Sequence, residues 1–544
     1  MKRSQMYNIL VYIILIYSIF HFSNIQCNNT EQEKEEDGES EREQYSRFMF
    51  LDDYCNRTST PPRFKKLILF IVDALRVDFV PTIQNSKSKP RLPFLEQTIR
   101  TNGVALQNIA SIPTVTLPRI KTLLSGTMPS FIDYIYNLNA YRFQSDNILQ
   151  QFHQDGKRIV FYGDDTWGNL FPPESEVFTR FNLTSSFFVT DYVEVDTNVT
   201  YNLRKELKQL NKWDVMILHY LGLDHIGHSH GYYSTLIPDK LLEMDQYFKE
   251  LFETLHSNPL EPSLIVFTGD HGMTNAGNHG GETHDETHTP LIFISTDNHS
   301  HRIINYPLNE QPIEQSMRTY LQNDLAPTIS SLFQMNIPQQ SQGRLISPVF
   351  DRFGIDQSEH LCSLFRNSIQ IQHIIKIRRN PKRYKNVEEF NQLKQLLYQA
   401  IKVHYKFVQD KHKVKEISNK LFEKSLKFYQ QFLNEVQHKY IRTIDIERNF
   451  LIYCITTIVI LLTVIAMLFR LEYLNQNSII FRLRLNEPIK NDLFGSIVER
   501  AVSLTIIIGN GIGMGSTNFM QNEHLFWNII QLIILFFINI KKYG

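Results

Sequence analysis

The chain has 544 residues, of which 42% are hydrophobic and 21% are charged, and its formal net charge is zero. This balance argues against nucleic-acid binding, which a basic excess would indicate. Such a length accommodates roughly three or four units of ~150 residues, and four cysteines are too few for a disulfide-stapled scaffold.

An apolar stretch near the N-terminus predicts a membrane anchor. YNILVYIILIYSIFHFSNI, residues 7–25, is almost uncharged and follows Lys2 and Arg3. It is long enough to span a bilayer, so we interpret residues 1–25 as an uncleaved signal-anchor, with a cleavable signal as the alternative. The acidic run EQEKEEDGESEREQ follows within residues 26–62, which we interpret as a solvated luminal linker.

Residues 63–350 are predicted to form an α/β domain, a mostly parallel sheet with helices on both faces. Short apolar runs alternate with amphipathic stretches, a pattern typical of a sheet with covering helices. The segment 240–256 has apolar residues at helical spacing and predicts one such helix. The clearest strands are nearly continuous in apolar residues, as strands buried on both faces are: LILFIVD, RIVFYGDD, DVMILHYLGLD, SLIVFTGD and TPLIFIS.

The composition changes toward the C-terminus. Residues 351–448 are rich in Lys, Gln, Tyr and Glu at helical spacing and predict helices that connect the α/β domain to a membrane region. Residues 449–544 contain the uncharged run FLIYCITTIVILLTVIAMLF at 450–469, a shorter apolar run at 525–540 and a Gly-rich one at 502–514. We therefore expect two or three transmembrane helices there.

Basic residues and glycosylation sequons set the predicted orientation. Lys2, Arg3 and the arginines beyond residue 469 are expected to stay cytoplasmic, which places the region between the spans in a lumen. N-x-S/T sequons in that region agree with this orientation, and they begin at Asn28, Asn56, Asn182, Asn198 and Asn298.

Carboxylates close several of the predicted strands, at Asp73, Asp164, Asp224 and Asp270. One such aspartate is usually a turn residue or a helix cap, but ligands of open α/β sheets bind beyond the carboxyl ends of the strands. Histidines accompany two of them, because DHIGH places His228 after Asp224 and DHG places His271 beside Asp270. Mixed carboxylate and imidazole ligands suit Zn²⁺ or Mn²⁺, and two clusters suggest a pair of divalent ions acting on a phosphoryl group.

A helix start beside these clusters predicts a nucleophile. IPTVTLPRIKTLLSG, residues 112–126, has the pattern of a helix with Thr116 at the N-cap and Pro118 in the first turn. A hydroxyl there faces the positive end of the helix, which also favours phosphate. A plain capping threonine is the ordinary interpretation; beside the metal clusters, Thr116 is the predicted nucleophile and Thr114 its competitor.

The order of the motifs FIVDALR, PTVTLPRIKTLLSG, FYGDDTW, LHYLGLDHIGHSHG and GDHGMTNAGNHGG resembles the alkaline phosphatase superfamily and, within it, the GPI ethanolamine phosphate transferases. The resemblance covers residues 64–349, and the stretches FIDYIYNLN and SFFVTDYVEVDTNVT look most like the type that modifies the second mannose. It implies an alkaline-phosphatase-like fold and two divalent ions. The implied ligands of the first ion are Asp73, Thr116, Asp270 and His271, and those of the second are Asp224, His228 and His279.

The resemblance also implies a reaction in the endoplasmic reticulum membrane. Thr116 would take phosphoethanolamine from phosphatidylethanolamine and pass it, through a covalent threonine intermediate, to a mannose of the GPI anchor precursor. Arg119, Trp167 and His230 are predicted to contact the phosphate, the head group or the rest of the substrate. The family implies a small multispanning stabilising subunit as partner and a long membrane region, so the spans predicted here correspond to a truncated, incomplete or reduced one.

Other functions remain compatible with parts of the pattern. The ligands alone do not separate a transferase from a membrane-tethered, metal-dependent phosphodiesterase that uses water as acceptor. A sulfatase is disfavoured, because Ser111-Ile112-Pro113 lacks the arginine that its nucleophile motif needs and no cysteine lies between Cys55 and Cys362. An inactive scaffold in GPI assembly is a third hypothesis, and the complete ligand set with Thr116 argues against it.

Overall fold

The computed structural model describes residues 41–438, with gaps at 58–60, 85–88, 129–142, 144, 187, 259, 298–318, 379–386 and 412–414. The chain forms two compact units, Met1–Ser46 and Arg47–Gly544, and the sheet lies in the second. The predicted membrane segments at 7–25, 450–469, 502–514 and 525–540 fall outside the described residues, as do Asn28 and Asn298. Within the described part, no helix has both the length and the apolar character needed to cross a bilayer.

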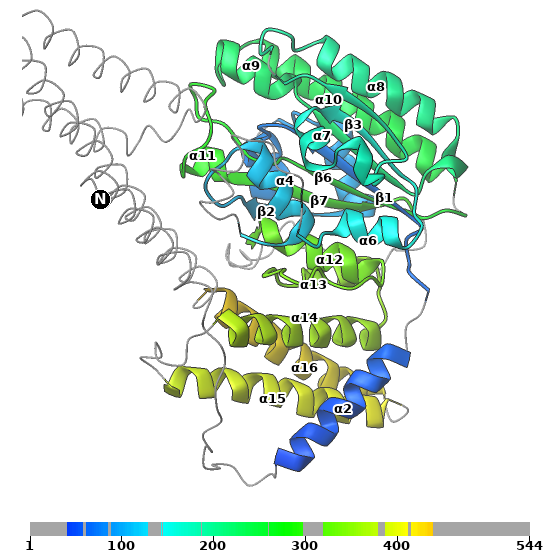
Figure 1. Ribbon diagram of the computed structural model, residues 1–544, viewed down its shortest axis with the longest axis vertical. Coiled ribbons are helices and arrows are strands. Elements are labelled where there is room, and N and C mark those ends of the chain that lie inside the picture. The colour runs from blue at the N-terminus through cyan, green and yellow to red at the C-terminus, as the bar shows by residue number, and fades with distance from the viewer. Residues whose placement is uncertain are drawn as a thin grey trace, which may run out of the picture. The chain divides into compact units, whose positions relative to one another are not determined.

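Eight strands of the described part form one sheet in the order β4-β3-β5-β1-β6-β7-β2-β8 (Figure 1). Strand β7 runs antiparallel to both β6 and β2, and the other pairs are parallel. The prediction of a mostly parallel sheet is confirmed, and the apolar runs named above are its central strands. The strands are β1 (Lys66–Val72), β2 (Gly103–Ile109), β3 (Ile159–Asp164), β4 (Arg180–Thr184), β5 (Val215–Tyr220), β6 (Ser263–Thr268), β7 (His288–Ser295) and β8 (Thr319–Leu321).

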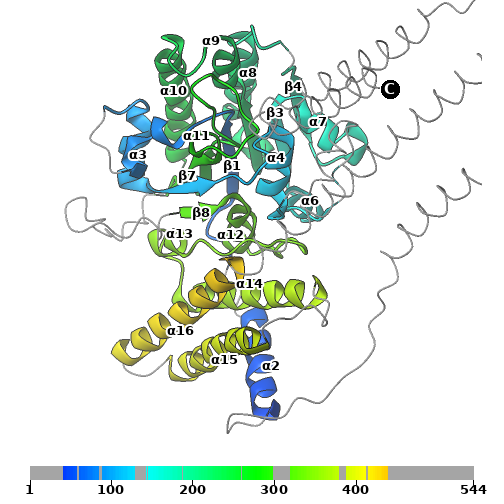
Figure 2. The same ribbon diagram turned by 90° about the vertical axis from the view of Figure 1, so that its left-hand side faces the viewer.

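Helices cover both faces of the sheet, also as predicted (Figures 1 and 2). Successive residues of a strand point to opposite faces, so in β1 Ile68 and Phe70 join one apolar core while Leu67 and Leu69 join the other. The first core is closed by α3 (Pro93–Asn102), α8 (Glu194–Leu207) and α10 (Leu236–His256). The second is closed by α4 (Thr116–Ser125), α6 (Ile148–Gln154), α7 (Thr166–Leu170), α12 (Leu325–Leu332) and α13 (Ser347–Arg352).

Short elements complete this part of the chain. Helices α9 (Gly222–His230) and α11 (His284–Thr287) lie at the carboxyl ends of the strands and carry or flank the site. The 3₁₀ turns are η1 (Val77–Phe79), η2 (Pro81–Gln84), η3 (Pro173–Ser175), η4 (Leu210–Lys212) and η6 (Gln322–Asp324).

A helical layer lies beyond α12 and α13 (Figures 1 and 2). It consists of α14 (Gln357–Arg378), α15 (Val387–Asp410), α16 (Lys415–Val436) and the second-unit part of α2 (Glu41–Arg57). Phe407 and Tyr429 are buried in the same apolar cluster as Leu69 of the sheet, so this layer extends the core of the domain. The predicted connector is therefore packed helix, because its apolar residues face inward at helical spacing.

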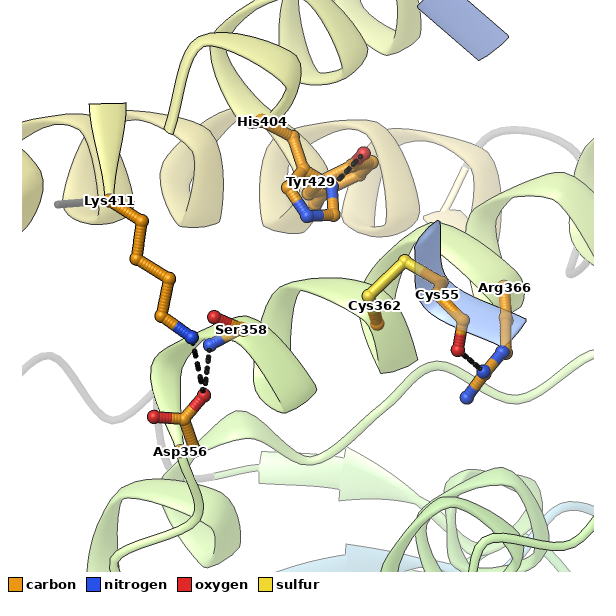
Figure 3. Close-up of a disulfide and its surroundings, with 8 residues drawn as sticks. All are labelled: Cys55, Asp356, Ser358, Cys362, Arg366, His404, Lys411 and Tyr429. Carbon is orange, nitrogen blue, oxygen red and sulfur yellow. Dashed lines mark hydrogen bonds and ion pairs between the residues drawn. A yellow bond between two sulfur atoms is a disulfide. The ribbon is translucent and has the colours of Figure 1, made fainter. Parts of the chain in front are cut away.

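A disulfide between Cys55 and Cys362 joins α2 to α14 (Figure 3). Cys55 is 2% exposed and Leu51, one turn earlier, is fully buried. The interpretation of residues 26–62 as a solvated linker thus does not hold for 47–57, where this buried stripe attaches the helix to the core. Cys55, Cys362 and His404 also bring two sulfurs and a ring nitrogen within 4.8 Å of one another, but the two sulfurs are already bonded to each other.

Candidate metal centre

The carboxyl ends of three neighbouring parallel strands gather the predicted ligands. Asp73 follows β1, Asp270 and His271 follow β6, and β5 leads into α9, which carries Asp224 and His228. Because β1 pairs with β5 on one side and with β6 on the other, these ends lie side by side. The backbone N–H of Ala74 donates to Asp270 Oδ1 at 3.4 Å, which ties the β1 end to the β6 end.

The first cluster contains the predicted nucleophile. His271 Nε2 lies 3.3 Å from both Asp73 Oδ1 and Asp270 Oδ2. Thr116 Oγ1 donates to Asp73 Oδ2 at 3.4 Å and lies 3.4 Å from His271 Nε2. Helix α4 begins at Thr116 and its N-cap is Val115, so Thr116 is the first helical residue and not the predicted cap. The shift frees its hydroxyl, because the side chain faces the cluster instead of closing the helix.

The second cluster lies on α9 and the loop after β6. His228 Nε2 lies 3.0 Å from His279 Nε2 and 3.4 Å from Asp224 Oδ2. His279 Nε2 lies 3.6 Å from Asp224 Oδ1. Asp224 and His228 meet because residues four apart share one face of a helix. The rings of His271 and His279 stack with centroids 4.0 Å apart, so the two clusters form one continuous site.

Hydrogen bonds behind the imidazoles fix which nitrogen faces the site. His271 Nδ1 lies 2.9 Å from the carbonyl oxygen of Gly272, and His279 Nδ1 lies 2.9 Å from that of Thr114. A carbonyl oxygen only accepts, so each Nδ1 carries the hydrogen and each Nε2 presents a lone pair. Metal-binding histidines ordinarily donate the hydrogen of their other ring nitrogen in this way, to a carbonyl oxygen or a carboxylate.

The carboxylates fit a cationic ligand. Asp73 Oδ1, Asp224 Oδ1 and Asp270 Oδ2 are buried and have no hydrogen-bond partner among the described residues. Burial raises the pKa of both Asp73 and Asp270 well above the ordinary value, and repulsion between neighbouring carboxylates adds to the effect. Burial also lowers the pKa of His271 well below its ordinary value, which keeps its lone pair available. Buried anionic oxygens without partners are costly, and divalent cations beside neutral imidazoles would satisfy them.

Thr114 has a supporting position. Its side chain is fully buried and donates to the carbonyl oxygen of Gly281 at 2.9 Å, while the N–H of Gly280 donates to Thr114 Oγ1 at 2.8 Å. With its own carbonyl on His279, Thr114 holds the loop that brings His279 to the site. Its hydroxyl is engaged there, whereas that of Thr116 faces the cluster.

Two of the predicted substrate contacts lie inside the protein. Arg119 is fully buried and donates to Ser111 Oγ at 2.7 Å and to Gln322 Oε1 at 3.3 Å. Gln322 in turn donates to the carbonyl oxygen of Asp270 at 2.6 Å, and burial lowers the pKa of Arg119 to about 9. Trp167 is also fully buried. Both residues therefore reach the site through their neighbours and present no surface to a substrate.

The remaining polar candidates lie outside the two clusters. His230 is exposed at the end of α9, with its ring edge toward Tyr192. His284, at the start of α11, has a side chain that is 59% exposed. Asp164 Oδ1 accepts the N–H of Thr166 at 3.0 Å, the turn role that is usual for a strand-end aspartate.

The described sequons differ in exposure. Asn182 is exposed on the edge strand β4, and Asn198 is half-buried within α8. Asn198 Nδ2, the atom that would carry a glycan, donates to Thr184 Oγ1 at 3.1 Å. Asn56 lies in α2, one residue after the disulfide-bonded Cys55. Glycosylation remains a prediction at these positions, of which Asn56 and Asn182 are exposed.

Metal affinity is expected to depend on pH through Asp73 and Asp270. Because their pKa values are raised, both carboxyl groups hold protons to a higher pH than an ordinary aspartate, whose pKa is about 3.9. Two protons must leave before the cation binds, so affinity should rise by up to about 100-fold per pH unit in the acidic range. Asp270→Asn should lower the Zn²⁺ affinity and reduce its pH dependence to about 10-fold per pH unit, because only one proton then has to leave. Chelator-competition titrations with Zn²⁺ between about pH 5 and 8 measure both quantities.

The raised pKa values of Asp73 and Asp270 also affect the stability of the metal-free protein, which should fall as the pH rises. The unfolded chain loses these protons more readily, so the metal-free protein should lose stability as the pH rises above about 4. Asp239→Asn, on the exposed side of α10, is the matched control and should leave the pH dependence of the metal affinity unchanged. An affinity that does not vary with pH would contradict the assignment of Asp73 and Asp270 as ligands.

Comparisons with known proteins agree with the motif pattern. The family described as type I phosphodiesterase / nucleotide pyrophosphatase matches residues 67–316. The chain is 40% identical over 341 residues to GPI ethanolamine phosphate transferase 2, catalytic subunit, of Homo sapiens, which covers 62% of this chain and 33% of that protein. It is 39% identical over 322 residues to GPI ethanolamine phosphate transferase 2 of Schizosaccharomyces pombe, covering 57% and 41% respectively. The predicted resemblance to the GPI ethanolamine phosphate transferases is confirmed.

The similarity concerns one part of larger proteins. The chain spans 33% of the length of the human relative and 41% of that of Schizosaccharomyces pombe. Among solved structures, the C-terminal periplasmic domain of EptC from Escherichia coli, in complex with Zn, is similar at 13% identity and a TM-score of 0.37. That match covers 50% of this chain and 83% of that chain.

Proposed function

We propose that this chain carries the catalytic domain of a membrane-bound transferase that moves phosphoethanolamine from phosphatidylethanolamine to a mannose of the GPI anchor precursor. The observation that supports this most is the convergence of every predicted ligand on one continuous site beside the Thr116 hydroxyl. The similarity to named GPI ethanolamine phosphate transferases supplies the substrate class. We propose the second mannose as acceptor, on the two stretches that resemble that type.

The ligand sets divide between two divalent cations, Zn²⁺ or Mn²⁺ by the chemistry of the donors. One would be held by Asp73, Thr116, Asp270 and His271, and the other by Asp224, His228 and His279. When bound, the cations favour the ionised form of the Thr116 oxygen and offset negative charge on the phosphoryl oxygens.

Thr116 performs the covalent steps. Its Oγ1 attacks the phosphorus of phosphatidylethanolamine, the bond to the glycerol oxygen breaks, and diacylglycerol leaves with the proton. The mannose hydroxyl then attacks the phosphorus of the threonine ester, the bond to Oγ1 breaks, and the mannose proton returns to Thr116. Two displacements replace one difficult transfer between two bulky alcohols. Thr116 opens α4, so free backbone N–H groups of the helix start lie beside the reacting phosphate.

We infer that the catalytic domain faces the lumen of the endoplasmic reticulum. The disulfide between Cys55 and Cys362 suits an oxidising compartment, and the exposed sequon at Asn182 suits the same side. The membrane anchors and the small stabilising subunit remain predictions from the sequence.

Mass spectrometry of GPI intermediates in cells that lack the protein tests the proposal. We expect precursors without phosphoethanolamine on one mannose, and recovery of the modified precursors when the wild-type chain is supplied. Fragmentation of the glycan identifies which mannose is affected. Release of free phosphoethanolamine with no change in the glycan would indicate the phosphodiesterase alternative. An unchanged glycan without such release would overturn both activities.

A further inference from the structure

A buried histidine that the sequence analysis did not select lies against the first cluster. His219 is in β5, opposite Ile71 of β1, and its side chain is fully buried. Its Nε2 lies 3.5 Å from Asp73 Oδ2, and a nitrogen of its ring lies within 4.8 Å of ligand atoms of both Asp73 and Asp270. On distance alone, His219 could serve as a further metal ligand.

The hydrogen bond from Trp167 argues against a role of His219 as a metal ligand. Its Nε1 donates to His219 Nδ1 at 2.9 Å. An indole N–H is a donor only, so Nδ1 must keep its lone pair, and the hydrogen of the neutral ring is on Nε2. His271 and His279 have the opposite arrangement, with the hydrogen on the Nδ1 that faces a carbonyl oxygen and none on Nε2. A nitrogen that carries a hydrogen cannot bind a cation, so the ring that Trp167 fixes presents a donor to the site.

We propose that Trp167 and His219 form a positioning pair for Asp73. His219 Nε2 lies 3.5 Å from Asp73 Oδ2, the oxygen that also accepts from Thr116, and has no closer hydrogen-bond partner among the described residues. Asp73 Oδ1 is left without a hydrogen-bond partner and is free for the cation. The pair thereby sets the rotation of the carboxylate and assigns a separate task to each oxygen. This inference rests on the metal centre of the proposed function, and it does not depend on the acceptor.

The FYGDDTW segment is built around this pair. Trp167 stacks on Phe161 of β3 with centroids 5.0 Å apart, and Asp164 holds the N–H of Thr166 at the start of α7. Gly163 has a φ of 144°, and a Cβ there would lie 2.3 Å from the carbonyl oxygen of His219. Only glycine lets β3 approach β5 this closely. The segment thus supplies the indole, its packing and the space for the histidine, and none of these residues needs to touch substrate.

Substitutions at His219 separate the possible roles. Glutamine places an amide N–H near the position of Nε2 and keeps a donor, but it is a poor ligand for Zn²⁺; leucine removes the donor and keeps most of the volume. We expect His219→Gln to retain Zn²⁺ affinity within a few-fold and His219→Leu to lose about 10- to 100-fold, the usual effect of removing a partner behind a ligand. The full chain, purified in detergent, is titrated with Zn²⁺ against a chelator, without substrate.

Trp167→Phe completes a double-mutant cycle. It removes the indole N–H that fixes the ring, so Zn²⁺ affinity should fall, and the loss should not add to that of His219→Leu because both act through one donor. Trp213→Phe is the matched control, since Trp213 is equally buried and donates to the carbonyl oxygen of Glu206, away from the ligands. If His219→Leu does not fold, Trp167→Phe and His219→Gln decide alone, with a loss expected only for the first.

Three results would overturn the inference. Equal losses in His219→Gln and His219→Leu would make His219 a direct ligand. Unchanged affinity in His219→Leu and Trp167→Phe would make it an ordinary core histidine. Fully additive losses would break the link between the two residues. Affinity is read without transfer, so failure of the transferase proposal would leave normal Zn²⁺ binding and normal variant effects, and the two failures are distinguishable.

Discussion

Replacing Thr116 by alanine should abolish phosphoethanolamine transfer while the domain stays folded. The hydroxyl is half-buried and contacts only Asp73 and His271 among the described side chains. Its loss removes the oxygen that we propose as the nucleophile, and removing a catalytic nucleophile costs roughly 10³-fold or more in turnover. Transfer from labelled phosphatidylethanolamine to mannosylated GPI precursor, measured in membranes that lack the endogenous enzyme, gives the loss directly.

Two variants separate the nucleophile from its neighbour. Thr116→Ser keeps the oxygen and should keep measurable transfer. Thr114→Ala should reduce transfer through Zn²⁺ binding, because the loop that carries His279 loses two hydrogen bonds. Rapid quenching and peptide mass spectrometry should find phosphoethanolamine on Thr116. Transfer by Thr116→Ala near the wild-type rate, or an adduct on Thr114, would refute the assignment.

The sequence was most informative where strand pattern and chemistry coincide. Asp73 and Asp270 could be placed because both end buried apolar runs, and parallel strands bring such ends to one edge of the sheet. His228 could be placed because four residues separate it from Asp224 on a helix. Thr116 was predicted as the N-cap and is the first helical residue, so the predicted helix start is off by one residue. An error of that size is usual for a helix boundary.

The missed features depend on contacts that no local pattern encodes. His219 is one polar residue inside an apolar strand, and it reaches the site only because β5 pairs with β1 in the register that sets it opposite Ile71. Arg119 and Trp167 have the chemistry of phosphate contacts, but the packing of α4 and α7 against the sheet buries them. Their polar groups instead donate to other side chains, Arg119 to Gln322 and Trp167 to His219, so they support the site without touching substrate.

The helical layer was underestimated for a related reason. The acidic composition before residue 57 favours a solvated linker. The two buried residues Leu51 and Cys55 are too few to predict a packed helix from the sequence. Cysteine connectivity cannot be deduced from sequence when partners are 307 residues apart. The disulfide therefore appears only once α2 and α14 are placed together.

Removing this disulfide is expected to have the largest effect on stability. Replacing Cys55 and Cys362 together by serine opens a loop of 307 residues, and loops of that length lie at the upper end of the usual gain of roughly 2–5 kcal/mol in the free energy of unfolding. The effect should concentrate in the helical layer, where the disulfide joins α2 to α14 and Arg366 of α14 donates to the carbonyl oxygen of Cys55 (Figure 3). Thermal and denaturant unfolding of the full chain in detergent measures the loss.

The metal centre should respond much less than the fold. Asp73 and Asp270 follow strands of the sheet and Thr116 begins α4, whereas the disulfide joins α2 to α14, so the double serine variant should bind Zn²⁺ with nearly wild-type affinity at low temperature and lose activity only on warming. Cys454→Ser leaves the pair intact and is the control for loss of a thiol. Non-reducing peptide mapping should recover the Cys55 and Cys362 peptides as one linked species. Free thiols at both positions, with unfolding unchanged by the double substitution, would show that packing alone holds α2 in place.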